Sequence, residues 1–523
     1  MRNWEIKNKD FKNNNIVDQI YKQKGINDFH KLFDLNENNL HDPFLLKDMT
    51  KAVDRIKQAI AHNEKILIYG DYDVDGITST YILYKTLLDL NADAYFHIPS
   101  RFYDGYGLND SKTLSIIEDN IKLVITVDNG IKSFNEAKTF KEHGIDLIIT
   151  DHHEIDKTLP DAFAIIHTNL SDYPFKPLAG VGVAYKLVEA LIGVEAYKYL
   201  DAVALGTIAD MMPLIEENRA IVNVGLERLK TTKNIGLKKL IEFLDITMPS
   251  VSDVQFKIAP RINACGRMKS ADIAVNLFMA KTSEEAVKLI STIENINNER
   301  KILSNRLYEE SLNLLDEKSH TIVIKSKSFH EGILGIVSSK LANETNKVSV
   351  VFKEEELTLK GSIRNYGEVD LINVLNQISD ILIRFGGHQN AAGLEIKVED
   401  FDEFRRRFND LIPKDIRPKK LFAEGIVNIH TLNINEIVDL DQYDLKDALF
   451  VFENLYIKSK YLIKNLHSKL TLSNNVEAIM FNNSKLNSDL LLSNKISLIG
   501  KLDTNFYRGI TKKIILIDDY KIL

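Results

Sequence analysis

Residues 65–76 read KILIYGDYDVDG, a short apolar run followed by a turn that carries three aspartates. The apolar run is typical of a buried strand, and the stretch ITSTYILYKTLLDL (77–90) after the turn has helical spacing. Further apolar runs are LVITV (123–127), LIIT (147–150) and AFAIIH (162–167). Apolar strands that alternate with helical segments predict a parallel sheet with helices on both faces.

Acidic residues and histidines follow these apolar runs directly. Asp128 follows LVITV, and His152 belongs to the string TDHH after LIIT. The run VALGTIA (203–209), which we also interpret as a strand, leads into Asp210. The carboxyl ends of strands in an open parallel sheet share one edge, and ligands bind there. We therefore expect one site made of Asp73, Asp75, Asp128, His152 and Asp210.

This set of side chains predicts a centre for two divalent metal ions. Clustered carboxylates repel one another unless a cation lies among them. Carboxylate oxygens with one imidazole and no thiolate suit Mn²⁺ or Mg²⁺ better than structural zinc. Five protein ligands exceed what one ion usually takes, and a pair of ions roughly 3.5–4 Å apart is the usual arrangement for hydrolysis of phosphate esters.

Other interpretations of the same residues are weaker. The string DxDxDG also opens a calcium-binding EF-hand loop, but the twelfth position of that loop is Ile82 and an apolar strand precedes it. One aspartate after a strand is usually a helix cap. Adjacent histidines are more often surface or core residues than ligands. The coincidence at several strand ends is what favours a metal centre.

The pattern along the chain divides it into six parts. The predicted parts are an N-terminal segment of short helices packed on the adjoining domain (1–45), a parallel-sheet domain (46–215), a helical connector with one long helix (216–318), a smaller α/β domain (319–402), a linker (403–420) and a β-barrel (421–523). The long helix is expected from residue 284 onward, where the sequence is amphipathic and free of proline and glycine.

The overall composition is ordinary for a globular protein, with 44% hydrophobic and 27% charged residues among 523. The single cysteine, Cys265, excludes a disulfide framework and a zinc site of several thiolates. The net charge of −7 argues against nonspecific nucleic-acid binding over the whole surface but is compatible with a local basic groove. The chain has no apolar run of membrane-spanning length and no signal-peptide pattern, so we expect a cytoplasmic protein.

Four strings in order, DYDVDG, TVDNG, DHH and GTIAD, resemble the motifs of the DHH phosphoesterase superfamily. Five further strings resemble the RecJ family of single-stranded-DNA-specific exonucleases: RFYDGYG (101–107), APRINACGRM (259–268), FHEGILGIVSSKL (329–341), KGSIR (360–364) and GGHQNAAGL (386–394). The resemblance covers nearly the whole chain. It implies a DHH domain, a long helix, a DHH-associated domain across the cleft and a C-terminal OB-fold.

The resemblance also implies roles for single residues. The metal ligands would be Asp73, Asp75, Asp128, His152 and Asp210, with Asp128 as the bridge between two Mn²⁺ or Mg²⁺ ions. His153 would position the scissile phosphate or act as general acid, and Asp71 and Asp151 would support the ligands. The chain departs from the family pattern at Tyr69, where some members have a ligating histidine, and in the OB region at ALFVFENLYIK (448–458).

The second half of the chain supplies candidates for binding the 5′ end of a strand. Arginine binds phosphate through a planar fork, and the candidates are Arg101, Arg267 and Arg364. Arg261 is the alternative to Arg267, and Ser362 adds a hydroxyl donor. His388 would point at the backbone from a glycine-rich loop, although a tight helix–turn junction also fits that string. Tyr106 would stack on a base.

The sequence therefore predicts a 5′→3′ exonuclease that degrades single-stranded DNA to mononucleotides in recombination and repair. The expected partners are single-stranded DNA, a helicase and a single-strand-binding protein, and the protein is expected to be a monomer without membrane contact. Alternatives are an oligoribonuclease, a cyclic-dinucleotide phosphodiesterase or a pyrophosphatase of the same superfamily. A non-catalytic DNA-binding accessory protein is a further alternative, which the intact set of ligands disfavours.

Overall fold

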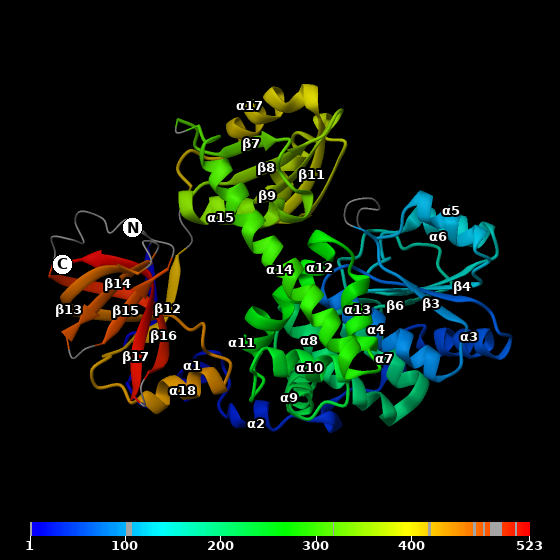
Figure 1. Ribbon diagram of the computed structural model, residues 1–523, viewed down its shortest axis with the longest axis horizontal. Helices are drawn as coiled ribbons and strands as arrows, with labels where there is room; N and C mark the ends of the chain where they lie inside the picture. Colours follow the sequence, from blue (N-terminus) through cyan, green and yellow to red (C-terminus); the bar gives the residue numbers. More distant parts are fainter. Residues whose placement is uncertain are drawn as a thin grey trace.

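Three β-sheets, each with its own hydrophobic core, organise the chain (Figure 1). The computed structural model describes residues 3–100, 107–316, 318–416, 420–463, 467–473, 476–481, 494–507 and 510–523. No helix within these ranges is both long and apolar enough to span a bilayer.

The first sheet is parallel throughout, as predicted. Its strands are β2 (Ile66–Tyr69), β3 (Ala94–His97), β4 (Leu123–Val127), β5 (Asp146–Thr150) and β6 (Ala164–Ile166). They lie in the order β3-β2-β4-β5-β6. The chain order reverses at β2, so the loops after β2 and β4 diverge from a switch point, where ligands bind in such sheets.

Helices cover both faces of this sheet because successive strand residues point to opposite sides. Ile66 and Ile68 pack into one core, whereas Leu67 and Tyr69 pack into another. The first face carries α3 (Met49–Ala61), α4 (Val74–Asp89), α7 (Gly180–Ile192) and α8 (Leu200–Ala209). The second face carries α5 (Asp110–Glu118) and α6 (Phe134–Glu142).

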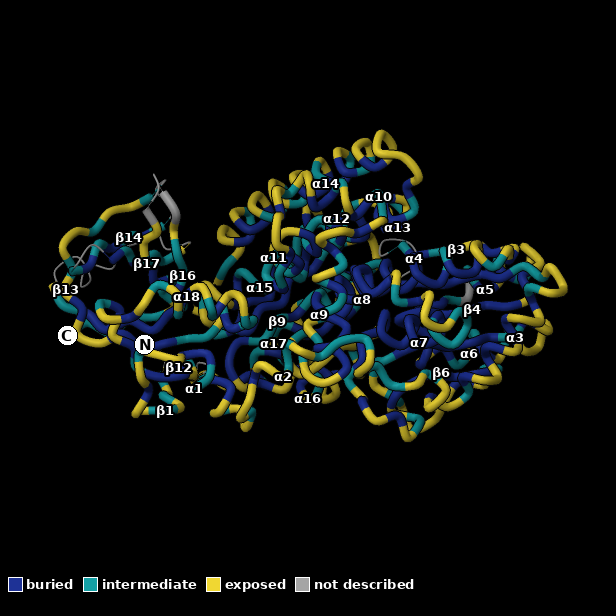
Figure 2. Tube along the Cα trace, turned by 90° about the horizontal axis from the view of Figure 1, so that it is seen from below, coloured by how far each residue is buried: buried dark blue, intermediate teal, exposed yellow. Residues whose placement is uncertain are grey.

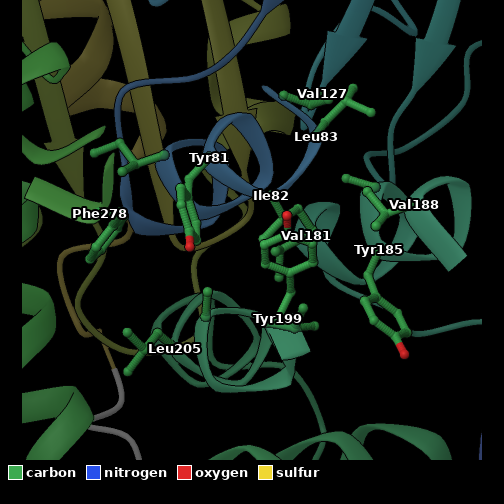
Figure 3. Packing of buried hydrophobic residues seen from close by; sticks show 14 of the residues in the cluster. Tyr81, Ile82, Leu83, Val127, Val181, Tyr185, Val188, Tyr199, Leu205 and Phe278 are labelled. Carbon is green, nitrogen blue, oxygen red and sulfur yellow. The ribbon is translucent and has the colours of Figure 1, made fainter. Parts of the chain in front are cut away.

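One sequence-based assignment in this domain is wrong. The run VALGTIA belongs to helix α8 and not to a strand. All the residues from Leu200 to Ile208 are buried, because α8 packs between α4, α7 and α9. A helix that is apolar on every side cannot be distinguished from a buried strand by its spacing. Figure 3 shows the core around it, with Tyr81, Val181, Tyr199 and Leu205 packed together.

Helices connect the first sheet to the second. They are α9 (Glu216–Lys230), α10 (Ile235–Phe243), α11 (Val251–Asp253), a π-helical turn (Val254–Ile258), α12 (Ala259–Met268), α13 (Asp272–Met279) and α14 (Ser283–Leu312). Helix α14 confirms the predicted long helix. It runs from the helical connector to the second α/β domain (Figure 1), and Figure 2 shows exposed residues along much of its length.

The second sheet has the order β10-β11-β9-β8-β7. Its strands are β7 (Ile322–Ser326), β8 (Ser349–Glu354), β9 (Thr358–Arg364), β10 (Arg384–His388) and β11 (Ala391–Lys397). Its helices are α15 (Leu334–Thr345), α16 (Leu371–Asn376) and α17 (Phe401–Leu411). The string GGHQNAAGL forms the antiparallel β10–β11 hairpin, so neither the predicted loop nor the helix–turn junction is correct.

The linker predicted at 403–420 is also wrong in its first half. Helix α17 occupies that part, and its Phe404 and Phe408 are fully buried. Their rings stack with centroids 5.4 Å apart, and Phe404 packs edge-on against Phe352 of β8. The basic residues between the two phenylalanines were interpreted as part of a linker. They belong to an amphipathic helix, because residues four apart share one helix face.

The third sheet forms a small closed barrel. Its strands are β12 (Leu421–Ile426), β13 (Phe450–Ile463), β14 (His467–Leu472), β15 (Glu477–Met480), β16 (Lys495–Tyr507) and β17 (Ile510–Ile522), with α18 (Ile434–Gln442) beside them. Pairing of β13 with both β14 and β16 closes five of these strands into a barrel, the arrangement of an OB-fold.

The N-terminal segment packs on this barrel and not only on the parallel-sheet domain that follows it in sequence. Strand β1 (Trp4–Asn8) pairs in parallel with β12. Helix α1 (Ile16–Gln23) buries Ile16 and Ile20 in the barrel core, and α2 (His30–Phe33) follows it. The prediction of short helices was incomplete, because the partner of β1 lies more than four hundred residues away.

Candidate active site

The acidic turn after β2 is tied to two helices. Asp73 is the N-cap of α4, and its Oδ1 accepts hydrogen bonds from the backbone N–H groups of Asp75 (3.0 Å) and Gly76 (3.2 Å). Asp75 lies in the first turn of α4. Its carboxylate accepts the backbone N–H groups of Gly180 and Val181 at the start of α7, each at 2.7 Å. The orientation of Asp75 is therefore held by backbone groups.

Asp128 follows β4 in a left-handed backbone conformation, with φ 63°. Aspartate and asparagine tolerate this region better than other non-glycine residues. A Cβ atom on Gly180 would lie only 2.3 Å from Asp128 Oδ1, so α7 must begin with glycine for the carboxylate to fit. Asp128 Oδ1 is buried and accepts no hydrogen bond from the described residues, as expected of a carboxylate oxygen that ligates a metal ion.

The two histidines after β5 share one supporting carboxylate. Asp151 Oδ1 accepts the backbone N–H groups of His152 (2.7 Å) and His153 (3.1 Å) and lies 2.8 Å from His153 Nδ1. Asp151 Oδ2 accepts the N–H of Ile131 at 2.9 Å. Asp151 thus holds both histidines at the strand end without joining the ligands itself.

His152 lies at the centre of the acidic cluster. Its Nε2 lies 3.2 Å from Asp128 Oδ1 and 3.8 Å from both Asp75 Oδ2 and Asp210 Oδ2. Asp210 is the C-cap of α8 and so reaches the cluster from a helix end, not from a strand end as predicted. The five predicted ligands nevertheless converge on one place.

These side chains form three groups that could hold metal ions. In each group the ligand atoms lie within 4.8 Å of one another. The groups are Asp71–Asp73–Asp128, Asp75–His152–Asp210 and Asp128–His152–His153. The first two groups share no residue and meet at the contact between Asp128 and His152. Two such groups fit two neighbouring ions, and Asp128 lies close enough to His152 to be a candidate ligand of both. Asp71 also joins the possible ligands.

The raised pKa values of the clustered carboxylates favour the binding of cations among them. Burial raises the pKa of Asp75 and of Asp128 well above the ordinary value, and the charges of neighbouring aspartates raise both further. Burial and the charge of Asp73 raise the pKa of Asp210 to about 6. Buried carboxylates that oppose one another's ionisation become stable when divalent ions bind between them. The residues present therefore fit Mn²⁺ or Mg²⁺.

The pKa values of the two histidines are shifted in opposite directions. Burial, followed by the charge of His153, lowers the pKa of His152 to about 4, so its imidazole is neutral and able to ligate. Burial opposes the charge of His153, but its hydrogen bond to Asp151 prevails and raises its pKa to about 9. The raised pKa favours a protonated His153 in the metal-free protein at neutral pH, a state that suits contact with a phosphate.

Tyr69 does not replace the missing histidine as a ligand. Its side chain packs in the core on the face of α5 and α6, and its hydroxyl donates to the carbonyl oxygen of Gly107 at 3.0 Å. Tyr69 thus anchors the chain at the end of the string RFYDGYG. Arg101 and Tyr106, which we predicted to contact substrate from that string, lie outside the described residues.

The structure distinguishes Arg267 from Arg261. Arg261 Nε donates to Glu294 Oε2 at 2.6 Å, and its Nη1 donates to the carbonyl oxygen of Lys257 at 2.9 Å. Arg267 instead lines a pocket of about 400 Å³ together with Arg364 at the end of β9. Arg267 is therefore the arginine of α12 that faces a site.

The pocket is built by the connector and the second α/β domain together. Arg364 Nη1 donates to Ser362 Oγ at 2.9 Å and to the carbonyl oxygen of Ile363 at 2.8 Å, so Ser362 orients the guanidinium. A Cβ atom on Gly335 of α15 would lie 2.5 Å from Arg364 Nη2. Glycine at this position of α15 therefore makes room for the arginine.

Helix α12 connects this pocket to the acidic turn. Asn263 Oδ1 accepts the backbone N–H of Val74 at 3.2 Å. A Cβ atom on Gly266 would lie 2.4 Å from the carbonyl oxygen of Tyr72, so the helix touches the turn directly. Arg267 follows Gly266 in the chain, and its position is thereby set relative to the metal ligands. His388 is exposed at the end of β10, and no described contact joins it to the pocket.

Sequence reasoning missed several residues of the site. The N–H groups of Gly180 and Val181 were missed, although the string LAGVG (178–182) places glycines at the start of a helix, a sign of close backbone approach. Asp71 was considered only a supporting residue. Two pocket residues of α15 were also missed: Lys340 lies within the string FHEGILGIVSSKL but was not singled out, and Asn343 lies outside the quoted strings.

A parallel sheet with an acidic, histidine-bearing edge beside a second α/β domain defines a phosphoesterase of the DHH class. The sequence matches the DHH family N-terminal domain over residues 65–207, the DHHA1 domain over 318–414 and the RecJ OB domain over 430–519. The second match includes α17, in agreement with its packing on the second sheet.

Similar proteins of known function identify the family within this class. The single-stranded-DNA-specific exonuclease RecJ of Haemophilus influenzae is 31% identical, and the match covers 97% of this chain and 96% of that protein. The RecJ of Bacillus subtilis is 38% identical over 92% of this chain, which spans only 64% of that longer protein. The chain belongs to the RecJ family of single-stranded-DNA-specific exonucleases.

Solved structures agree with this assignment. The crystal structure of RecJ from Thermus thermophilus in complex with Mn²⁺ has a TM-score of 0.81 at 27% identity, covering 96% of this chain and 75% of that chain. The Mg²⁺ complex of the same protein has a TM-score of 0.75 at 26% identity, covering 96% of this chain and 74% of that chain. The metals in those structures are the two that the ligand chemistry of this chain favours.

Proposed function

We propose that this chain is a two-metal exonuclease that hydrolyses single-stranded DNA from its 5′ end and releases mononucleotides. The observation that carries the proposal is that one helix, α12, touches the acidic turn at Tyr72 and presents Arg267 to the pocket of Arg364. A metal centre at a set position from a terminal phosphate pocket suits removal of one nucleotide at a time from a phosphorylated end.

The residues that would hold the two ions are Asp71, Asp73, Asp75, Asp128, His152 and Asp210, with Asp128 as the proposed shared ligand. When bound, the ions supply a water of lowered pKa and stabilise negative charge that develops on the phosphate. The protein holds these ligands in position through the backbone N–H groups at the start of α7 and through the N-terminus of α4. Preorganisation of this kind avoids rearrangement during the reaction.

The cationic residues of the site position the substrate. His153, protonated at neutral pH, can contact the scissile phosphate and donate a proton to the leaving oxygen. Arg267 and Arg364 would bind the terminal 5′ phosphate, with Ser362 holding the fork of Arg364. The barrel would bind the downstream strand, as OB-folds do.

Several parts of the expected biology stay predictions. These are the role in recombination and repair, the helicase and single-strand-binding partners, the cytoplasmic location, the monomeric state, and the contacts of Arg101, Tyr106 and His388 with DNA. Two observations support DNA as the substrate: the chain belongs to the RecJ family, and it contains the barrel. An oligoribonuclease or a cyclic-dinucleotide phosphodiesterase does not need such a strand-binding barrel.

The decisive experiment compares single strands labelled at the 5′ end with the same strands labelled at the 3′ end, in Mn²⁺. We expect immediate release of labelled mononucleotide from the 5′-labelled strand and progressive shortening of the 3′-labelled strand. Early release of the 3′ label, or equal cutting of blunt duplex DNA, contradicts the proposal. Asp128→Asn serves as the control for contaminating nucleases.

A further inference from the structure

A stripe of side chains on α15 extends the phosphate pocket beyond the two arginines. Besides Arg267 and Arg364, the pocket is lined by Gly335, Ile336, Ser339, Lys340 and Asn343. These positions lie on one face of the helix, since they are separated by one, three or four residues. At 1.5 Å per residue, the stripe rises about 12 Å along the helix axis.

The stripe offers donors suited to further anionic groups. Lys340 lines the pocket, and its Nζ lies 3.7 Å from the ring centroid of Tyr308 on α14. Ser339 and Asn343 add a hydroxyl and an amide, and neither residue is fully buried. The lining thus contains three cationic side chains and no carboxylate.

One terminal phosphate does not account for this lining. A phosphate monoester carries about −1.5 to −2 charges at neutral pH, which two arginines balance. The pocket measures about 400 Å³, many times the ~10–15 Å³ that one water molecule needs on the same measure. Room, cationic charge and hydrogen-bond donors therefore remain beyond the position of the first phosphate.

We infer that the pocket accepts a strand that ends in a 5′-triphosphate, a proposal that rests on the proposed 5′→3′ function. The phosphate next to the sugar binds at Arg267 and Arg364, and the outer two extend along Ser339, Lys340 and Asn343. Water adds to the phosphorus that follows the first nucleotide, and the bond from this phosphorus to O3′ breaks. The 3′ oxygen takes a proton. The first product is then a nucleoside 5′-triphosphate, and the shortened strand has a 5′-monophosphate.

The test uses one DNA sequence with three ends: 5′-hydroxyl, 5′-monophosphate and 5′-triphosphate. The label is in the base of the first nucleotide, and the first product is identified under single-turnover conditions in Mn²⁺. We expect the triphosphate strand to release labelled nucleoside triphosphate at a rate within about tenfold of the monophosphate strand. Lys340→Ala should lower the triphosphate rate relative to the monophosphate rate by about tenfold, the scale of one lost charge-assisted hydrogen bond. Lys340→Arg should restore most of the ratio.

Lys327→Ala is the matched control, because Lys327 is an exposed lysine of the same domain and does not line the pocket. Rejection of the triphosphate strand by protein that degrades the monophosphate strand would overturn the inference while leaving the proposed function standing. An equal loss on both ends in Lys340→Ala would also overturn it. Failure to degrade any of the three strands would refute the proposed function itself.

A binding measurement on the metal-free protein provides a readout apart from activity. Calorimetry with inorganic tripolyphosphate and with orthophosphate avoids competition for the metal ions. We expect tripolyphosphate to bind at least about tenfold more tightly, and Lys340→Ala to remove most of that difference. Equal affinities of the two anions would overturn the inference.

Discussion

The candidate metal centre and the proposed phosphate pocket concentrate opposite charges by different structural means. The acids of the centre come from one domain, and Asp75 and Asp128 are each only 2% exposed. The pocket is half-exposed and combines α12, α15 and β9, so it exists only while two domains are correctly placed. The centre is therefore a rigid site with a large electrostatic cost, whereas the pocket is an adaptable site with a small one.

This difference separates function from stability. Carboxylates buried together destabilise the metal-free fold, because each raises the cost of ionising the next. The arginines of the pocket incur little of that cost, since water still reaches them. Removing a charge at the centre should therefore lower activity while maintaining or raising the stability of the metal-free protein. Removing a charge at the pocket should change only the preference for one substrate end over another.

The largest effect is expected for Asp128→Asn. This change removes the proposed shared ligand and should lower kcat by a factor of about 10²–10³ or more. Asparagine tolerates the left-handed backbone of residue 128, so the loss does not arise from strain. The measurement is single-turnover release of mononucleotide in Mn²⁺. Retention of more than a tenth of the rate would contradict the role of Asp128 as the bridge.

The same variant should show the opposite effect on stability. In metal-free protein, Asp128→Asn should unfold at the same temperature as the unchanged protein or a higher one, because it removes a buried like charge. Mn²⁺ at about a hundred times its Kd should stabilise the unchanged protein by about 2.7 kcal/mol and the variant by much less. Thermal unfolding with and without Mn²⁺ measures both. A destabilised metal-free variant would show that the charge cluster is not strained.

A smaller loss is expected for Gly180→Ala, which changes no charge. The new methyl group would meet Asp128 Oδ1 at 2.3 Å and must displace the carboxylate. A displacement near 1 Å typically costs about a hundredfold in rate. The matched control is Gly182→Ala on the same helix, where the nearest neighbour of the new methyl group is the Leu178 side chain at 3.2 Å. Normal kinetics in Gly180→Ala would show that the ligand set tolerates movement.

At the pocket, Arg364→Ala should reduce the preference for 5′-phosphorylated over 5′-hydroxyl ends by about tenfold or more. Charged hydrogen bonds contribute about 1.5–3 kcal/mol, and the hydroxyl end makes none of them. Arg364→Lys should recover only part of the preference, because lysine lacks the planar fork. The ratio of kcat/KM on the two ends is the readout. An equal loss on both ends would refute phosphate recognition by Arg364.

The smallest effect is expected for Arg261→Ala. Arg261 is engaged by Glu294 and by the backbone of Lys257, and it does not line the pocket. The preference for a 5′ phosphate should stay within about twofold of the unchanged protein, whereas Arg267→Ala should reduce it severalfold. The reverse result would exchange the roles of these two arginines.

The sequence by itself determined the parallel sheet and the candidate ligands at its edge. Strand and turn signals are local, and Asp73, Asp75, Asp128 and His152 each follow an apolar run closely. Parallel strands must align their carboxyl ends, so convergence of these residues could be predicted from their positions in the chain. The long helix was equally predictable, because its amphipathic spacing continues over many turns.

Only the tertiary structure decided which elements complete the site. The run before Asp210 is a helix because its neighbours bury every side of it, and burial on all sides erases the periodicity that distinguishes helix from strand. The pairing of β1 with β12 and the choice of Arg267 over Arg261 depend on contacts between distant segments. The approach of Gly180 to Asp128 depends on such a contact as well. Local sequence does not encode such contacts, because they arise from packing of whole elements against one another.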